Sequence, residues 1–226
     1  MSDTSADAGV VQSRSQLERL ITANELAGRT IAGFAAISVG LRGMDLDSTI
    51  FERVDVREAD GDEARLERAE LRQLDGRKST WRGALWNRVR AGDCDLTEIC
   101  FAGATLLRCE LGPVRLPRAS FHRARISQTT FRDSELYSAD FREAYLRKVV
   151  FEGYSGATVS LSRTDFAGAT LLEVDFRRAN LYSASFRRAS LIRCDLSGAN
   201  LSGVDLAGAR LVGCKTNGVD LDGATW

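Results

Sequence analysis

Large apolar residues stand at every fifth position of this chain from Leu41 to Trp226. The exceptions are Gly61, Gly76, Ala91, Gly156 and Thr216. A second column, two residues before each of these positions, is small or β-branched except at Met44, Leu74 and Tyr154. A period of five matches neither the 3.6-residue period of an α-helix nor the two-residue period of a flat strand. The chain is therefore expected to turn a corner every five residues, with both columns pointing inward.

A short repeat of this kind predicts a solenoid, because each unit can bury its apolar face only by stacking on its neighbours. The repeats are clearest in the segments ADFREAYLRK, which begins at Ala139, and CDLSGANLSGVDLAGARL, which begins at Cys194. Over residues 41–226 the chain resembles the pentapeptide-repeat family, whose units read A-(D/N)-(L/F)-x-x. The resemblance implies an all-β fold, a right-handed quadrilateral β-helix with four pentapeptides, or about 20 residues, in each coil.

This geometry predicts which side chains stack. Residues about 20 positions apart lie above one another at a spacing of about 4.8 Å. The phenylalanines are then expected to form three ladders on three faces: Phe101, Phe121 and Phe141; Phe131 and Phe151; Phe166 and Phe186. The pattern weakens over residues 74–93 and 151–160, and each stretch is expected either to bulge within its coil or to leave the solenoid as a loop.

The chain before residue 41 lacks the strong repeat. Residues 1–14 are polar and are expected to form a disordered leader, and residues 15–40 are expected to hold a capping helix and weak first repeats. Ser15 and Glu18 form a candidate capping box, and Gly28 is a candidate helix stop. The short helix is expected to cover the N-terminal edge of the solenoid, with docking of a partner as the alternative.

The composition gives little support for catalysis or for a metal site. The chain has 31 basic residues, 31 acidic residues and one histidine, His122, with no serine or cysteine motif near it. The aspartates that recur just before central residues are expected to bond nearby backbone N–H groups in turns. The cysteine spacings match no zinc motif. Cys194 and Cys214 are expected to stack as free thiols, a disulfide being the alternative. We therefore predict a protein that is not an enzyme and has no catalytic, cofactor or metal site.

The sequence also bears on localisation. It has no apolar stretch long enough for a membrane helix and no signal-peptide core, so we predict a cytoplasmic protein without a membrane partner.

One column of the predicted outer surface is basic. Its members, taken 20 residues apart, are Arg68, Arg88, Arg108, Gln128, Lys148, Gly168 and Arg188, with Arg147 and Arg187 beside it. Like charges at this spacing destabilise a fold unless neighbouring carboxylates, such as Glu67, compensate them. The alternative is that Arg68, Arg88, Arg108, Arg147, Lys148, Arg187 and Arg188 bind an anionic partner.

Several functions are compatible with such a rod. We predict a rigid scaffold that binds a protein partner and has no small-molecule substrate. Resemblance to family members that protect DNA gyrase, a type II topoisomerase, from inhibitors by mimicking DNA implies an alternative role in antibiotic resistance. However, the outer surface of residues 41–226 carries both charges in near balance, whereas a DNA mimic needs a strongly negative surface. An accessory role in a bacterial secretion system and direct binding of nucleic acid along the basic column are further alternatives.

The last coils are expected to expose apolar side chains, among them Leu221 and Trp226. An exposed apolar coil end is a liability unless it is covered. Family members commonly dimerise through their C-terminal ends, and the resemblance implies the same here. We therefore predict a homodimer whose contact includes Leu221 and Trp226.

Overall fold

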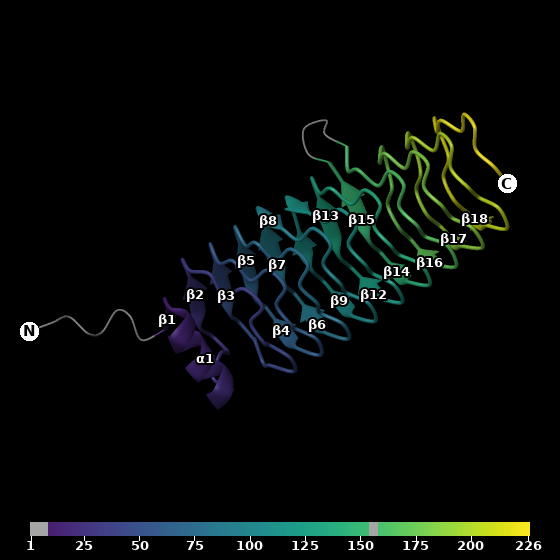
Figure 1. The fold of residues 1–226 in the computed structure, drawn as a ribbon. Coiled ribbons are helices and arrows are strands. Elements are labelled where there is room, and N and C mark those ends of the chain that lie inside the picture. Colours follow the sequence, from purple (N-terminus) through teal and green to yellow (C-terminus); the bar gives the residue numbers. More distant parts are fainter. Residues whose placement is uncertain (1–8, 154–157) are drawn as a thin grey trace, which may run out of the picture.

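The computed structural model describes residues 9–153 and 158–226. These residues form a rod in which the chain winds through about ten turns of a parallel β-solenoid, with one short helix at its N-terminal end (Figure 1). The quadrilateral β-helix expected from the repeat is confirmed: each turn contributes four short segments, and each segment pairs with its equivalent in the next turn.

Two of the four faces are eight-stranded parallel sheets. The first sheet contains β1 (Val10–Val11), β2 (Thr30–Ala32), β3 (Ile50–Glu52), β5 (Glu70–Arg72), β7 (Arg90–Gly92), β10 (Glu110–Leu111), β13 (Thr130–Arg132) and β15 (Val150–Glu152). The second sheet contains β4 (Arg65–Glu67), β6 (Leu85–Asn87), β9 (Thr105–Leu107), β12 (Arg125–Ser127), β14 (Tyr145–Arg147), β16 (Thr170–Leu172), β17 (Ser190–Ile192) and β18 (Arg210–Val212).

The other two faces are built mainly from single parallel bridges. One, which we call the Phe121 face, runs through bridges such as Ser120↔Asp140. The other runs through bridges such as Asp55↔Asp75 and includes the short strands β8 (Cys94–Asp95) and β11 (Val114–Arg115). All four faces surround one continuous apolar core.

The five-residue repeat places each side chain because every position has a fixed role. The central residue points inward, as Phe121 does with no exposed surface, and the residue two before it is also buried, as Ala119 is. The residue two after the centre turns the corner in the left-handed region, for example Arg108 at φ 55°. From Gly198 onward this corner residue is glycine, which adopts positive φ without strain.

The aspartates before central residues have the predicted role in turns. Asp140 Oδ1 accepts a hydrogen bond of 2.9 Å from the backbone N–H of Arg142, and Asp205 does the same for Ala207. Because the same contact recurs around the rod, these carboxylates stabilise local turns, as the sequence predicts.

The N-terminal segment differs from expectation in three respects. Residues 1–8 lie outside the described part of the chain, but β1 lies within the segment predicted to be disordered and pairs with β2. Helix α1 (Arg14–Ala23) is capped by Ser13, two residues before the predicted Ser15, and the Ser13 side chain accepts from the Gln16 N–H at 3.3 Å. The helix ends at Asn24 in the left-handed conformation, before Gly28 is reached. Its Leu17 is buried in the core, so α1 packs on the first coil.

The stacking interval changes once along the rod. Arg132 pairs with Glu152, 20 residues on, whereas Glu135 pairs with Ser160 and Asp140 with Asp165, 25 residues on. This coil therefore contains one extra pentapeptide between β15 and Ser160. Residues 154–157, among them Tyr154 and Gly156, lie outside the described residues. The interval returns to 20 afterwards, as between β16 and β17.

The extra pentapeptide makes the predicted third phenylalanine ladder wrong. Phe166 stacks on Phe141 with ring centroids 5.0 Å apart, so Phe166 and Phe186 continue the ladder of Phe101 and Phe121. Phe151 likewise stacks on Phe176 at 5.2 Å, which lengthens the second ladder. These phenylalanines thus form two long ladders that meet edge to face inside the rod, for example at Phe121 and Phe131.

The other weak stretch, residues 74–93, stays within the solenoid. Asp75 pairs with Asp95 and β6 pairs with β4, so no loop leaves the coil there. Trp81 and Trp86 are buried and pack edge to face, with ring centroids 5.5 Å apart. Gly61, an exception to the apolar column, lies directly against the Trp81 ring, so the missing side chain makes room for the indole.

Candidate partner-binding surface

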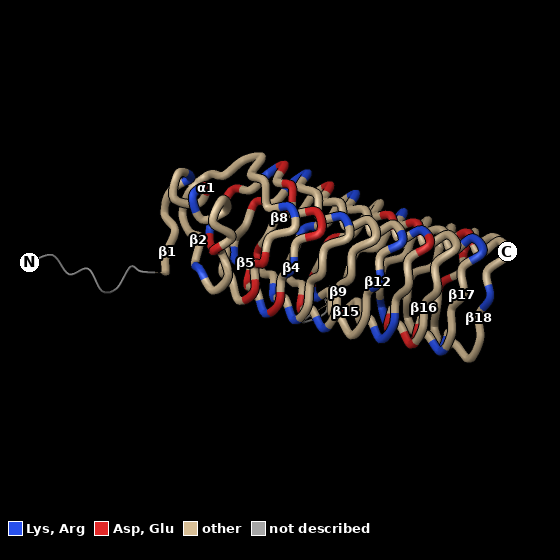
Figure 2. Tube along the Cα trace, turned by 90° about the horizontal axis from the view of Figure 1, so that it is seen from below, with Lys and Arg blue, Asp and Glu red and all other residues tan. Residues whose placement is uncertain are grey.

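The surface with the most one-sided charge lies on the second sheet, from β6 to β14. We call it the basic face. It comprises the outward residues of these strands with the corner residue after each: Leu85, Asn87, Arg88, Thr105, Leu107, Arg108, Arg125, Ser127, Gln128, Tyr145, Arg147 and Lys148. Five of these residues are basic and none is acidic. Figure 2 shows the distribution of charged residues on the side of the rod where β4, β9 and β12 lie.

Part of the predicted basic column is present as one stacked row. The backbone N–H groups of Arg68, Arg88, Arg108, Gln128 and Lys148 each bond the coil above at the same corner. After Lys148 the row continues with Glu173, because Lys148 bonds the carbonyl of Leu172. Arg147, beside Lys148, pairs with Leu172 in the second sheet.

The prediction that Gly168, Arg187 and Arg188 extend this column is wrong. The Gly168 N–H bonds the Arg187 carbonyl on the Phe121 face, and the Arg188 N–H bonds Ala207 on the same face. Arg187 is also neutralised there by Asp205, at 2.8 Å. The extra pentapeptide rotates these residues by one face relative to a strict 20-residue register, which separates them from Lys148.

Carboxylates compensate most of the row: Arg88 also lies 4.0 Å from Glu67, and only Arg108 among its cations has no carboxylate partner in the described residues. At one end Arg68 pairs with Asp47 at 2.8 Å and with Glu67 at 3.1 Å. At the other end Lys148 lies 3.8 Å from Glu173. Between them, Arg108 donates to the Gln128 amide oxygen at 2.9 Å rather than to a carboxylate.

Two further cations stand unpaired near Arg108. Within the described residues, Arg125 and Arg147 have no carboxylate oxygen within 4.0 Å. The predicted column contains only corner residues, which stand two positions after a central residue. Arg125 stands one position before the central residue Ile126, so it is absent from that column. A second column, made of the residues one position before each central residue and taken 20 residues apart, contains Arg125 between Thr105 and Tyr145.

Aliphatic side chains lie among these cations. Leu85 and Leu107 are half-buried and point outward, because their strand neighbours Trp86 and Leu106 fill the core. The basic face is therefore flat and mixed, with guanidinium groups beside small apolar areas.

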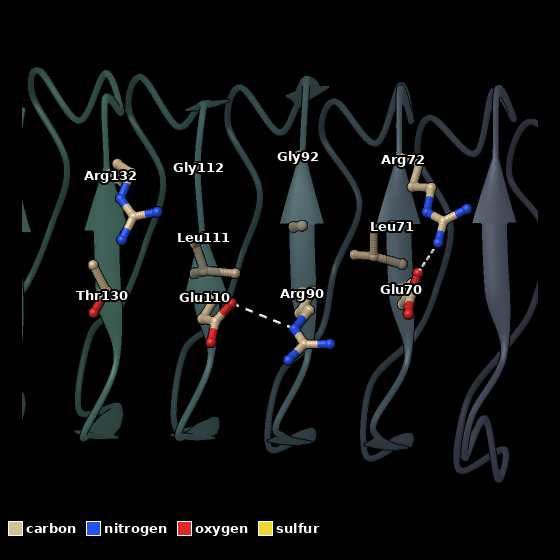
Figure 3. Close-up of a pocket in the computed structure, with 11 residues that line it drawn as sticks. Glu70, Leu71, Arg72, Arg90, Gly92, Glu110, Leu111, Gly112, Thr130 and Arg132 are labelled. Carbon is tan, nitrogen blue, oxygen red and sulfur yellow. Dashed lines mark hydrogen bonds and ion pairs between the residues drawn. The ribbon is translucent and has the colours of Figure 1, made fainter. Parts of the chain in front are cut away.

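A second feature is a shallow hollow of about 350 Å³ on the first sheet (Figure 3). Gly92 and Gly112 leave the backbone bare between Arg72 and Arg132, and Arg90 lies below them. Each arginine has a carboxylate partner: Arg72 bonds Glu70, Arg90 bonds Glu110 at 3.4 Å, and Arg132 bonds Glu152 at 2.9 Å. The hollow is therefore electrically balanced and has no unpaired charge to attract a ligand.

The last coil presents a third surface. Trp226 is 73% exposed and Leu221 is 41% exposed, and both line a hollow of about 240 Å³ over the open core. Leu206, Leu211 and Val219 form its floor and walls. The predicted dimer residues thus lie together at one exposed apolar end.

Burial makes three of the five cysteine thiols unreactive. Burial raises the pKa of Cys94 and of Cys109 to about 11, and that of Cys194 to about 12. A thiol with such a high pKa is protonated at neutral pH and is a poor nucleophile. Cys194 and Cys214 are free. The described residues contain no cluster suited to a metal ion and no helix long and apolar enough to cross a membrane.

Comparison with known proteins agrees with the geometry. The family model for pentapeptide repeats matches eight copies over residues 115–153, 160–198 and 199–225, and its first break falls at the extra pentapeptide. No curated protein matches the chain.

Solved structures of similar proteins include HetL, a pentapeptide-repeat protein involved in heterocyst differentiation regulation from Nostoc sp. strain PCC 7120. It is 20% identical, with 93% of this chain and 95% of that chain covered and a TM-score of 0.37. QnrB1, a plasmid-mediated fluoroquinolone resistance protein, is 17% identical, with 85% and 93% covered and a TM-score of 0.39. The eight matched copies and the four-sided coil with its two inward columns lead to one conclusion: the chain belongs to the pentapeptide-repeat family.

Proposed function

We propose that this protein is a rigid, non-catalytic scaffold that holds an anionic protein partner on its basic face. The observation that carries the proposal is the group of Arg108, Arg125 and Arg147, three exposed cations without a carboxylate partner in the described residues. Many other cations of the rod pair with carboxylates of the next coil, as Arg123 does with Glu143 at 2.8 Å. Because the same fold can neutralise stacked cations, a face with five basic and no acidic residues favours a binding role.

The architecture suits a scaffold. The core runs without interruption along the rod, and parallel hydrogen bonds fix each coil to the next. A surface that is ordered before binding loses little conformational entropy when a partner docks, which favours affinity. Exposed cations also accelerate the encounter with an anionic partner, an effect that salt weakens.

Charge reversal tests this function. We expect the triple variant Arg108→Glu, Arg125→Glu, Arg147→Glu to lose the partner that the wild type captures from native cell extract. Capture by the wild type should fall steeply as salt is raised, because screening weakens contacts between exposed charges. The readout is quantitative mass spectrometry of proteins retained on immobilised rod.

The matched control changes the net charge equally on other faces. Lys78→Glu, Arg163→Glu and Arg188→Glu reverse three exposed residues for which no ion pair occurs among the described residues. This control should retain the partner. Equal capture by both triple variants, or equal loss from both, would refute a role for the basic face.

The same experiment separates the alternative functions. A type II topoisomerase among the captured proteins would favour gyrase protection, which is then tested by relief of inhibitor-poisoned supercoiling. Components of a secretion system would favour the accessory role. The name of QnrB1 associates that protein with fluoroquinolone resistance, but the near-balanced charge of this rod lacks the long negative surface that a DNA mimic needs.

The exposed coil end is the proposed dimer contact. Two copies joined end to end by a two-fold axis would cover Leu221 and Trp226 with the same surface of the other copy. We expect sedimentation to give a dimer for the wild type at micromolar concentration and a monomer for Trp226→Asp. Tyr182→Asp, which changes another exposed aromatic residue away from this end, should remain dimeric. A monomeric wild type would rule the contact out.

A further inference from the structure

We infer that the partner segment held by the basic face is an amphipathic α-helix with a row of carboxylates, an inference that rests on the proposed function. Three observations support it: the coil-to-coil spacing of the corner row, the aliphatic side chains beside it, and the flatness and short length of the basic face.

The spacing of the row matches one edge of a helix. Arg88, Arg108, Gln128 and Lys148 occupy successive coils of one corner column, so the row advances by about 4.8 Å per coil. An α-helix lying along the rod advances by about 5.4 Å per turn, and its residues at i, i+4, i+7 and i+11 share one edge. Three coil steps span about 14 Å, and eleven helical residues span about 16 Å. Flexible arginine and glutamate side chains absorb this small difference.

The aliphatic residues indicate a protein partner rather than a polyphosphate. Leu107 stands beside Arg108, and Leu85 lies across the same sheet. Both are half-buried: Leu107 brings apolar area to the middle of the basic face, and Leu85 brings it to the β6 end. Phosphate oxygens gain nothing from such contacts, whereas an amphipathic helix with carboxylates on one edge carries apolar residues on the next.

The shape of the face also favours a helix over duplex DNA. β6, β9, β12 and β14 lie side by side in one parallel sheet, so Arg125 and Arg147 project from a flat surface and Arg108 lies at its corner. The phosphates of a duplex strand wind around its axis, and a straight row meets only a few of them at each crossing. A straight helix of about three turns, some 16 Å long, covers the whole patch.

Fluorescence anisotropy with defined probes tests the inference. The first probe is an alanine-based peptide with glutamate at i, i+4, i+7 and i+11 and leucine along the adjacent edge. The second has the same composition with a central proline, which breaks the helix. The third is a 20-base-pair DNA duplex. We expect the helical peptide to bind at least about tenfold more tightly than the proline peptide, because the helix is ordered before it binds.

Variants connect binding to the face. Arg108→Glu, Arg125→Glu, Arg147→Glu should weaken binding of the helical peptide more than about tenfold, since each reversal replaces attraction with repulsion. Leu107→Ser should weaken this peptide severalfold and leave duplex binding unchanged. Leu172→Ser, in the same column beyond the patch, is the matched control and should bind the peptide like the wild type.

The outcomes separate the two proposals. Equal affinity for the two peptides, or tighter binding of the duplex, with loss in the triple variant, would overturn the helix and leave an anionic partner in place. Binding of all probes that is insensitive to the triple reversal would overturn both the helix and the proposed function. Circular dichroism and thermal melts of each variant show whether the rod remains folded.

Discussion

Phe121→Ala is expected to lower the free energy of unfolding by about 3–5 kcal/mol. Phe121 has no exposed surface and stacks between Phe101 and Phe141, with centroids 5.4 Å and 4.6 Å away. Its edge also meets Phe131 at 6.0 Å. Truncation removes contacts with three rings and leaves a cavity that hydrogen-bonded coils on both sides hold open. Chemical denaturation followed by circular dichroism measures the loss.

Arg123→Ala is the matched control for this substitution. Arg123 lies two residues further on, and its side chain is 67% exposed in a salt bridge with Glu143. Solvent screens this pair, so the denaturation midpoint should barely change. Similar losses for Phe121→Ala and Arg123→Ala would contradict the inside–outside assignment of the repeat.

The two inward columns could be predicted from the sequence because nearly every repeat has the same residue types at the same positions. A central residue such as Leu146 has other large apolar residues five and ten positions away, as nearly every central residue of the repeat does. The shared pattern therefore indicates that all of these residues point inward. The turn role of Asp140 was predictable for the same reason, since a residue type that recurs at one position serves local geometry.

The position of a residue around the rod was harder to predict. The extra pentapeptide has the length of one repeat, so the five-residue pattern continues unbroken while every later residue moves by one face. Arg188 thus keeps a corner position but lies on the Phe121 face, away from Lys148. Tyr154 and Gly156 break both columns near the place, but Leu74 and Gly76 do the same where the interval stays at 20 residues.

The N-terminal strand illustrates another limit of sequence patterns. Val10–Val11 is two residues long and carries no detectable period, and it pairs only because β2 offers an open edge. Likewise, the capping residue was assigned to Ser15 because Glu18 lies three residues on, while the structure uses Ser13 with Gln16. Ser13 and Ser15 are both residue types that suit an N-cap, so the sequence pattern does not distinguish them.

Gly61→Leu is expected to destabilise the rod by about 3 kcal/mol, although leucine is the usual residue at this position of the repeat. A Cβ atom at Gly61 would overlap the indole ring of Trp81, which lies in the next coil and is only 5% exposed. The ring cannot move aside easily, because it packs against Trp86 at 5.5 Å. The absence of a side chain at Gly61 therefore provides the space that the Trp81 indole occupies.

A double variant tests this size exchange. Trp81→Leu alone should destabilise by about 2 kcal/mol by leaving a cavity, yet Gly61→Leu combined with Trp81→Leu should be more stable than either single variant. The control is Gly92→Ala, whose new methyl group would approach no atom closer than 3.8 Å and should preserve stability. Strictly additive losses in a double-mutant cycle of denaturant melts would show that the two sites are independent. A favourable coupling would establish that the two exceptions to the repeat, an absent side chain and an oversized one, form a single packing unit.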